Sequence, residues 1–193
     1  MALELRLDTA DVLALRFARS PLWETMQALR VTREPDRQAY HLSWLRSLDL
    51  AAVADAATVL APLVPRPGTQ PDFLIPIPGG PTTTADNDLA AVAATPLDAV
   101  ERELAAAAED PRAAADVRAE VRALLVDPSG GLHRVVEAQR TCWEHLVRPF
   151  WTQIDDLLAS DIAWRAAQLA TAGLESVLAG LSPHVAWTGD GLR

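Results

Sequence analysis

A helical repeat of apolar residues over 132–181 is the feature that most constrains the fold of this chain. Apolar side chains recur there at steps of three and four, which places them along one face of an α-helix, whereas a strand would alternate apolar and polar residues. Four of the six tryptophans lie in or just beyond this stretch: Trp143, Trp151, Trp164 and Trp187. We therefore predict a mainly α-helical, multi-helix fold with these helices at the centre of the core.

Start and stop signals divide the rest of the chain into further helices. Ser20 followed by Pro21 is typical of an N-cap and a first helical residue, and the helix that they begin should end before Pro35. Asn87 or Asp88 is the expected cap of a shorter helix, and 127–131 reads as a loop. The other predicted helices cover about 9–17, 36–48, 50–60, 96–109, 111–126 and 132–148, with a last one capped by Ser160 and ending at Gly180.

A minor β element is predicted from the two ends of the chain. Residues 3–7 alternate leucine with charged side chains, the period of a half-buried strand. Residues 184–188 can form a second strand, and we expect the two to pair. Only Leu192 and Arg193 follow the turn residues 189–191, which is too short for a returning hairpin arm, so the sequence reads as cut off within an element.

A proline-rich stretch covers residues 62–84, where seven prolines exclude a helix and an internal strand. Phe73, Leu74, Ile75 and Ile77 make this stretch too apolar for a free linker. We expect an extended segment that lies on the helices with its apolar side chains buried. The alternative that it forms the edge of a pocket stays open.

Composition narrows the partners and the compartment. The net charge is −9 and every one of the 17 basic residues is arginine. This acidic balance argues against binding of a nucleic-acid backbone by this chain alone, because such binding needs a clustered basic face. The single cysteine excludes an internal disulfide and fits a reducing cytosol. No signal peptide and no uninterrupted apolar run of membrane-spanning length is present, so we expect a cytoplasmic protein with no membrane partner.

Cys142 and His145 are the only pair with the spacing of a reactive site. Three residues apart on a helix, they share a face and could form a nucleophile and base. A structural zinc site needs more thiolate ligands than one cysteine supplies. The expectation is therefore a packed cysteine beside an unrelated histidine, with no catalytic residues, no metal ligands and no cofactor.

The aromatic side chains allow two interpretations. Tryptophans at helical spacing most simply fill the core, but large aromatics on facing helices can also line a cavity for an apolar ligand. We expect such a cavity between the helix at 21–33 and the helices at 132–158. Its predicted lining is Trp23, Trp44, Phe73, Trp143 and Trp151.

Three segments in a fixed order resemble a known family. They are residues 16–24 (RFARSPLWE), residues 71–74 (PDFL) followed by Pro76 and Pro78, and residues 143–151 leading to Asp161, Arg165 and Gly173. Together they resemble the N-terminal helical domain of actinobacterial ArsR-type winged helix-turn-helix transcriptional regulators.

The resemblance implies that 1–193 is a single helical regulatory or effector domain, with a DNA-binding winged helix beyond residue 193. In that case the chain would act as a homo-oligomer and would reach DNA only through the missing domain. Its ligand, if it has one, would be a small apolar organic molecule, because one cysteine cannot build a thiolate metal sensor.

Two other functions remain as alternatives. A pure dimerisation or scaffold domain would have a filled core and a large apolar face on its last helices. An enzyme using Cys142 and His145 would need both side chains in one open cleft with a third polar group.

Overall fold

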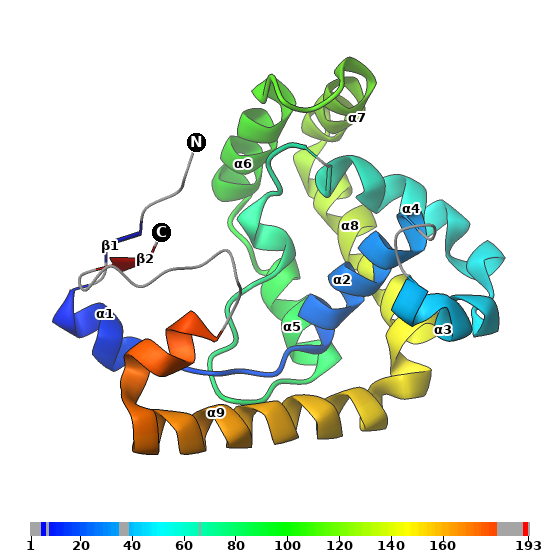
Figure 1. Ribbon diagram of the computed structural model, residues 1–193. Helices are drawn as coiled ribbons and strands as arrows, with labels where there is room; N and C mark the ends of the chain where they lie inside the picture. The colour runs from blue at the N-terminus through cyan, green and yellow to red at the C-terminus, as the bar shows by residue number, and fades with distance from the viewer. Residues whose placement is uncertain (1–4, 7, 35–38, 66, 181–190, 193) are drawn as a thin grey trace. The chain divides into compact units, whose positions relative to one another are not determined.

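The computed structural model describes residues 5–6, 8–34, 39–65, 67–180 and 191–192, and it confirms a mainly α-helical fold (Figure 1). The α-helices are α1 (Thr9–Ala14), α2 (Pro21–Arg33), α3 (Leu42–Ser47), α4 (Ala54–Leu60), α5 (Ala85–Ala93), α6 (Leu97–Glu109), α7 (Ala115–Leu125), α8 (Pro128–Cys142) and α9 (Trp151–Ala179). Short 3-10 turns are η2 (Ala39–His41), η3 (Leu50–Val53), η4 (Ala61–Leu63), η5 (Asp72–Leu74) and η7 (Arg148–Phe150), and η6 (Trp143–Val147) is a π-helix.

The chain forms two compact units. Unit 2 is the continuous segment Ser20–Trp151, and unit 1 combines Met1–Arg19 with Thr152–Arg193. Unit 1 is therefore discontinuous in sequence, with the whole of unit 2 inserted between its two parts.

Helix α8 is the centre of unit 2. It packs against α2, α4, α5, α6 and α7 (Figure 1). Its inward face, with Leu132, Val135 and Val136, is buried, and so are Leu146 and Val147 of η6. The prediction that the apolar repeat over 132–181 forms the core is thus confirmed for its first part. It is wrong for α9, in which Val177 and Leu178 are the buried residues.

Helix starts in unit 2 follow local hydrogen bonds. The Ser20 hydroxyl accepts from the backbone N–H of Trp23 at 3.0 Å, which confirms the predicted cap of α2. The loop predicted at 127–131 is instead the first turn of α8, because Asp127 accepts from Gly130 N–H and Pro128 takes the first helical position. Thr84, rather than Asn87 or Asp88, caps α5.

A polar turn delays the start of α7 from the predicted 111 to Ala115. The Asp110 carboxylate accepts from the backbone N–H and the guanidinium of Arg112, each at 2.9 Å to Oδ1, and from the Thr69 hydroxyl at 2.6 Å to Oδ2. An aspartate that bonds the backbone two residues ahead favours a turn over a helix. The turn also ties the proline-rich segment to the helices, through Thr69.

Unit 1 contains α1 and nearly all of α9. In it, Arg19 pairs with Asp155 at 2.6 Å, and Arg165 pairs with Asp161 one helical turn away. Ser160 lies inside α9 and donates to the carbonyl of Asp156, so the predicted cap at Ser160 is wrong. The helix changes direction at Gly173, whose φ of 80° and ψ of 172° are outside the helical region (Figure 1).

The described strands are β1 (Leu5–Arg6) and β2 (Gly191–Leu192), which pair antiparallel with Leu5 opposite Leu192. The N-terminal strand thus pairs with 191–192, so Gly191 belongs to a strand and not to the predicted turn. The partner strand predicted at 184–188 lies outside the described residues. None of the helices in the described part of the chain is long and apolar enough to cross a membrane.

Candidate functional site

The junction of α2, α8 and the proline-rich segment is held by one buried amide. Gln139 of α8 is fully buried, and its side-chain nitrogen donates to the carbonyl of Leu74 at 2.8 Å and contacts the sulfur of Met26 at 3.7 Å. Phe73 and Leu74 are buried here, as predicted for this segment, whereas Ile77 is exposed. The amide thus fixes part of the proline-rich segment through a backbone carbonyl.

The five aromatics predicted to line a cavity occupy different surroundings. Phe73 and Trp143 are buried in the core, Trp44 and Trp151 are partly buried, and Trp23 is 50% exposed. Trp143 and Trp151 are in edge-to-face contact, with ring centroids 5.4 Å apart at 71°.

The packing of α2 on η6 is filled by aliphatic side chains. Leu22, Met26 and Leu146 are at most 1% exposed there. None of the three cavities described below is lined by any of the five aromatics. A ligand pocket made by these rings stays a prediction.

The π-helix η6 sets which side chains face the core at this junction. It adds residues to the turn between Trp143 and Val147, with the N–H of Arg148 bonded to the carbonyl of Trp143. Trp143, Leu146 and Val147 are consequently buried, while His145 is exposed.

The pair Cys142 and His145 does not form an open reactive site. Cys142 is fully buried, and this burial raises the pKa of its thiol to about 12. The thiolate is the nucleophilic form of cysteine, and the raised pKa disfavours it. Because Cys142 is buried and His145 is exposed, the two side chains do not share an open cleft. Among the residues that the structure describes, no group of three His, Cys, Asp or Glu side chains could hold a metal ion.

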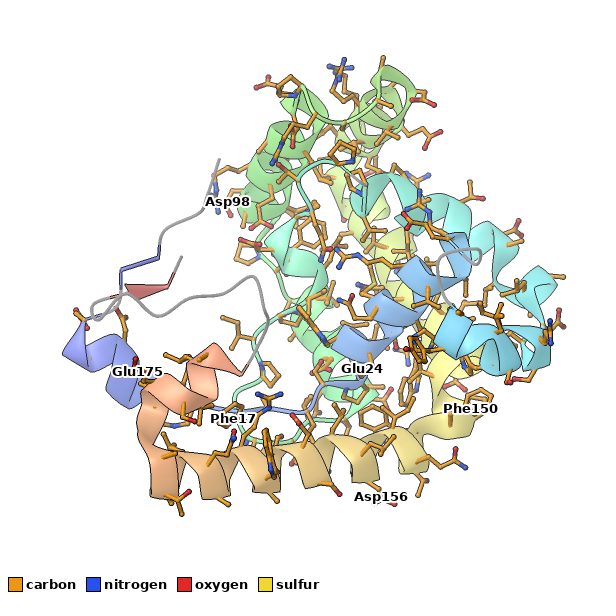
Figure 2. The ribbon with its side chains drawn as sticks, viewed as in Figure 1. Phe17, Glu24, Asp98, Phe150, Asp156 and Glu175 are labelled. Carbon is orange, nitrogen blue, oxygen red and sulfur yellow. The ribbon has the colours of Figure 1, made fainter. Side chains whose placement is uncertain are left out.

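A buried carboxylate lies at the start of α2. Asp88, in the first turn of α5, is 3% exposed. Its Oδ2 accepts from the Ser20 hydroxyl at 2.8 Å and from the backbone N–H of Leu22 at 3.2 Å. The positive end of the α2 dipole therefore faces this negative charge. Nearby Glu24 is partly buried, and burial raises the pKa of its carboxyl (Figure 2).

A cavity of about 270 Å³ lies beside Asp88. One wall is the proline-rich segment and the other is formed by residues of α5. Its lining is Pro76, Ile77, Pro78, Gly79, Gly80, Thr82, Thr83, Asn87, Asp88 and Ala91. This agrees with the alternative that the proline-rich segment edges a pocket. Asp88 is the charged residue of this lining, and Thr82, Thr83 and Asn87 add hydroxyl and amide groups to the cavity wall.

Two other cavities are less suited to a specific ligand. One of about 340 Å³ is an open groove between the end of α5 and the starts of α6 and α8, where His133 is exposed. The other, of about 110 Å³, is lined by Arg30, Arg33, Glu34 and Val64. Arg33 is already committed there to the carbonyls of Ala61 and Val64.

The role of Asp88 was not predicted because its partners are distant in sequence. A helix cap is predicted from a side chain within one turn of the helix start, and on that ground the sequence offered Asp88 as a cap of its own helix, α5. Its bonds instead reach residues 20 and 22, about which the local sequence carries no signal.

Comparison of the chain with protein-family models, with curated proteins and with solved structures finds no match.

Proposed function

We propose that this chain is the regulatory domain of a bacterial, cytoplasmic DNA-binding transcription regulator, acting through ligand sensing, pairing of protomers or both. Support comes from the ordered resemblance to actinobacterial ArsR-type regulators. Two of the resembling segments also meet in unit 2, since α2, which begins in the first segment, packs on η6, which begins the third. Gln139, which lies outside the segments, joins Leu74 of the second segment to Met26 of α2.

One observation carries the pairing of protomers, namely the apolar side chains that α9 leaves exposed. Leu157 is 71% exposed and Trp164 is 54% exposed, and their separation of seven positions places both on one side of the helix. A second copy of this chain is the proposed partner, because a two-fold interface lets the same stripe cover itself. Dimeric regulators read operators with two half-sites, which suits this arrangement.

The filled packing of α2 on η6 favours the second candidate, a dimerisation domain without a ligand. Leu22, Met26 and Leu146 are buried at that junction, and none of them lines the three cavities described above. In this alternative the domain acts only by pairing protomers through Leu157 and Trp164 of α9, and small effectors do not change DNA binding.

Sedimentation velocity over a range of protein concentrations tests the pairing. We expect a dimer for the unchanged chain and a monomer for the double variant L157E/W164E, since charges in an apolar interface are costly. Ala170→Glu is the matched control, because Ala170 is also exposed on α9 but lies on another side of the helix. A monomer at all concentrations, or a dimer that the double variant leaves intact, would contradict the pairing.

Regulation of transcription is tested with the tagged protein expressed from its own gene in its host. Immunoprecipitation of cross-linked DNA should enrich a few discrete promoters, and the L157E/W164E variant should lose most of that enrichment. Uniform background recovery would reject the regulator. Melting-temperature shifts across a screen of organic effectors then separate the two candidates, since a ligand that binds the folded state raises the melting temperature.

A further inference from the structure

Asp88 is a buried anion without a cationic partner. It is 3% exposed, and the residues that the structure describes place no arginine or histidine within ion-pair distance of it. The start of α2 compensates only part of the charge, since a helix N-terminus carries roughly half an elementary charge. Burying a carboxylate with incomplete compensation costs free energy unless another positive group is supplied.

The two oxygens of this carboxylate are used unequally. The hydrogen bonds from the Ser20 hydroxyl and from the Leu22 N–H both go to Oδ2. Oδ1 accepts no hydrogen bond from any described residue. Because Asp88 also lines the cavity beside α5, Oδ1 is the acceptor that remains for a group bound in that cavity.

The rest of the cavity wall has two kinds of surface. Thr82, Thr83 and Asn87 supply neutral hydrogen-bonding groups. Pro76 and Pro78 supply an apolar wall whose backbone is restricted by the proline rings, while Ile77 between them is 95% exposed. With about 270 Å³, the space is close to the lower end, roughly 300 Å³, of cavities that hold drug-sized ligands.

We propose that this cavity binds a small organic cation, a primary ammonium group carried on a short apolar body. The ammonium donates to Oδ1 of Asp88 and to the neighbouring hydroxyls, and the apolar body lies against the rings of Pro76 and Pro78. A bound metal ion is a poorer fit, because hard cations require several oxygen ligands of which carboxylates form a large part, and this wall has one carboxylate. An organic anion would be repelled by the same group.

Binding of an amine in this cavity does not depend on the proposed regulatory function, because it can be measured on the purified chain whatever the role of that chain. It also differs in place and in chemistry from the aromatic pocket expected from the sequence.

Titration of the purified full chain with paired probes tests the proposal. Benzylamine and cyclohexylmethylamine are compared with benzyl alcohol and cyclohexylmethanol, which have the same shape without the charge, using calorimetry and ligand-observed NMR at pH 7. We expect saturable binding of the amines and at least tenfold weaker binding of the alcohols. Equal binding of amine and alcohol, or no saturation by either amine, would overturn the proposal.

Two variants locate the binding site. Asp88→Asn keeps an oxygen for the Ser20 and Leu22 donors but removes the charge, and it should weaken amine binding at least tenfold. Ala91→Phe fills the cavity from α5 without touching those bonds, and it should abolish binding. Ala90→Phe is its matched control, because Ala90 is the adjacent exposed residue of α5 outside the lining.

The variants also exclude a purely structural role of Asp88. If the aspartate only caps α2, Asp88→Asn and Ala91→Phe will both leave amine affinity unchanged. If Asp88→Asn fails to fold, the comparison of Ala91→Phe with Ala90→Phe still decides, since neither substitution alters the cap of α2.

Discussion

Three buried polar side chains, Asp88, Asp110 and Gln139, hold segments of unit 2 that helix packing alone leaves free. Asp88 joins α5 to the start of α2, and Gln139 joins α8 to the proline-rich segment. Asp110 joins the turn before α7 to Thr69. Buried polar groups that are paired in this way select one arrangement among several that bury similar apolar area.

The first residue-scale prediction concerns acid stability and Asp110. Hydrogen bonds from Arg112 and Thr69 hold the pKa of this carboxyl well below its usual range. A carboxyl with a lowered pKa stabilises the folded state above its ordinary pKa, near 4, and loses that contribution as the pH falls toward the folded value. Asp110→Asn should therefore lower the melting temperature at pH 7, and its deficit should shrink below about pH 4.

Thermal unfolding between pH 2.5 and 7 measures this effect. Glu101→Gln is the control, because Glu101 is exposed on α6 and has none of the bonds of Asp110. A deficit that is the same at both ends of the pH range would show that the lost bonds matter but the charge does not.

A second residue-scale prediction concerns the reactivity of Cys142. Its thiol is fully buried, and its raised pKa keeps it protonated, so a thiol reagent can react only after the core opens. An opening that costs about 4 kcal/mol slows labelling about a thousand-fold relative to the unfolded chain. Labelling rates with an aromatic disulfide, in buffer and in urea, check this. Comparable rates in the two solvents would place the thiol at the surface.

At the scale of elements, local signals were predictable and distant ones were not. The cap by Ser20 and the stop before residue 35 depend on side chains within one turn of each helix end, and α2 begins and ends as expected. The start of α8 was missed because two glycines in its first turn resemble a loop, although Asp127 bonds Gly130 and Pro128 suits the first position. The π-helix η6 and the hydrogen bonds from Ser20 and Leu22 to Asp88 depend on tertiary packing, which no local sequence pattern reports.

The candidate site shows the same division. The proline-rich segment could be recognised as the edge of a pocket, because its apolar residues require a surface to lie on. Which pocket it edges depends on the distance between α5 and that segment, and no residue pattern reports this. The aromatic residues were chosen as pocket candidates because they are large and few. Asp88, which lines the cavity, is one of 26 acidic residues, and its sequence surroundings do not distinguish it from the others.

The element-scale prediction concerns the kink in α9. Gly173 has φ 80° and ψ 172°, a region that is essentially restricted to glycine. A Cβ there meets no atom within 4 Å, so the whole cost of Gly173→Ala is backbone strain. We expect a loss of about 1–3 kcal/mol in unfolding free energy.

Urea denaturation followed by circular dichroism measures that loss. Gly79→Ala is the control, since its Cβ also meets no atom within 4 Å and its φ is not positive. If Gly173→Ala instead gains stability and helical signal, the kink has straightened and the strain argument fails.

At the scale of the molecule, the division into two units predicts that unit 2 is autonomous. Ser20–Trp151 includes α2 to α8 with their buried side chains, and its capping and tethering bonds are internal. A protein of residues 20–151 alone should therefore unfold cooperatively and keep its helical signal. Non-cooperative melting by circular dichroism, with strong binding of a hydrophobic dye, would mean that the core needs unit 1.

The discontinuity of unit 1 sets an order of events at the ribosome. Within this sequence, Met1–Arg19 is synthesised before unit 2, and its partners in Thr152–Arg193 are synthesised after unit 2. All the residues of unit 2 have been synthesised by then, and segments of a chain fold as they become complete. Folding of unit 2 brings the two distant parts of unit 1 closer and reduces the loop that the ion pair between Arg19 and Asp155 must close. Folding of the inserted unit 2 should therefore precede and favour folding of unit 1, whose two parts flank it in the sequence.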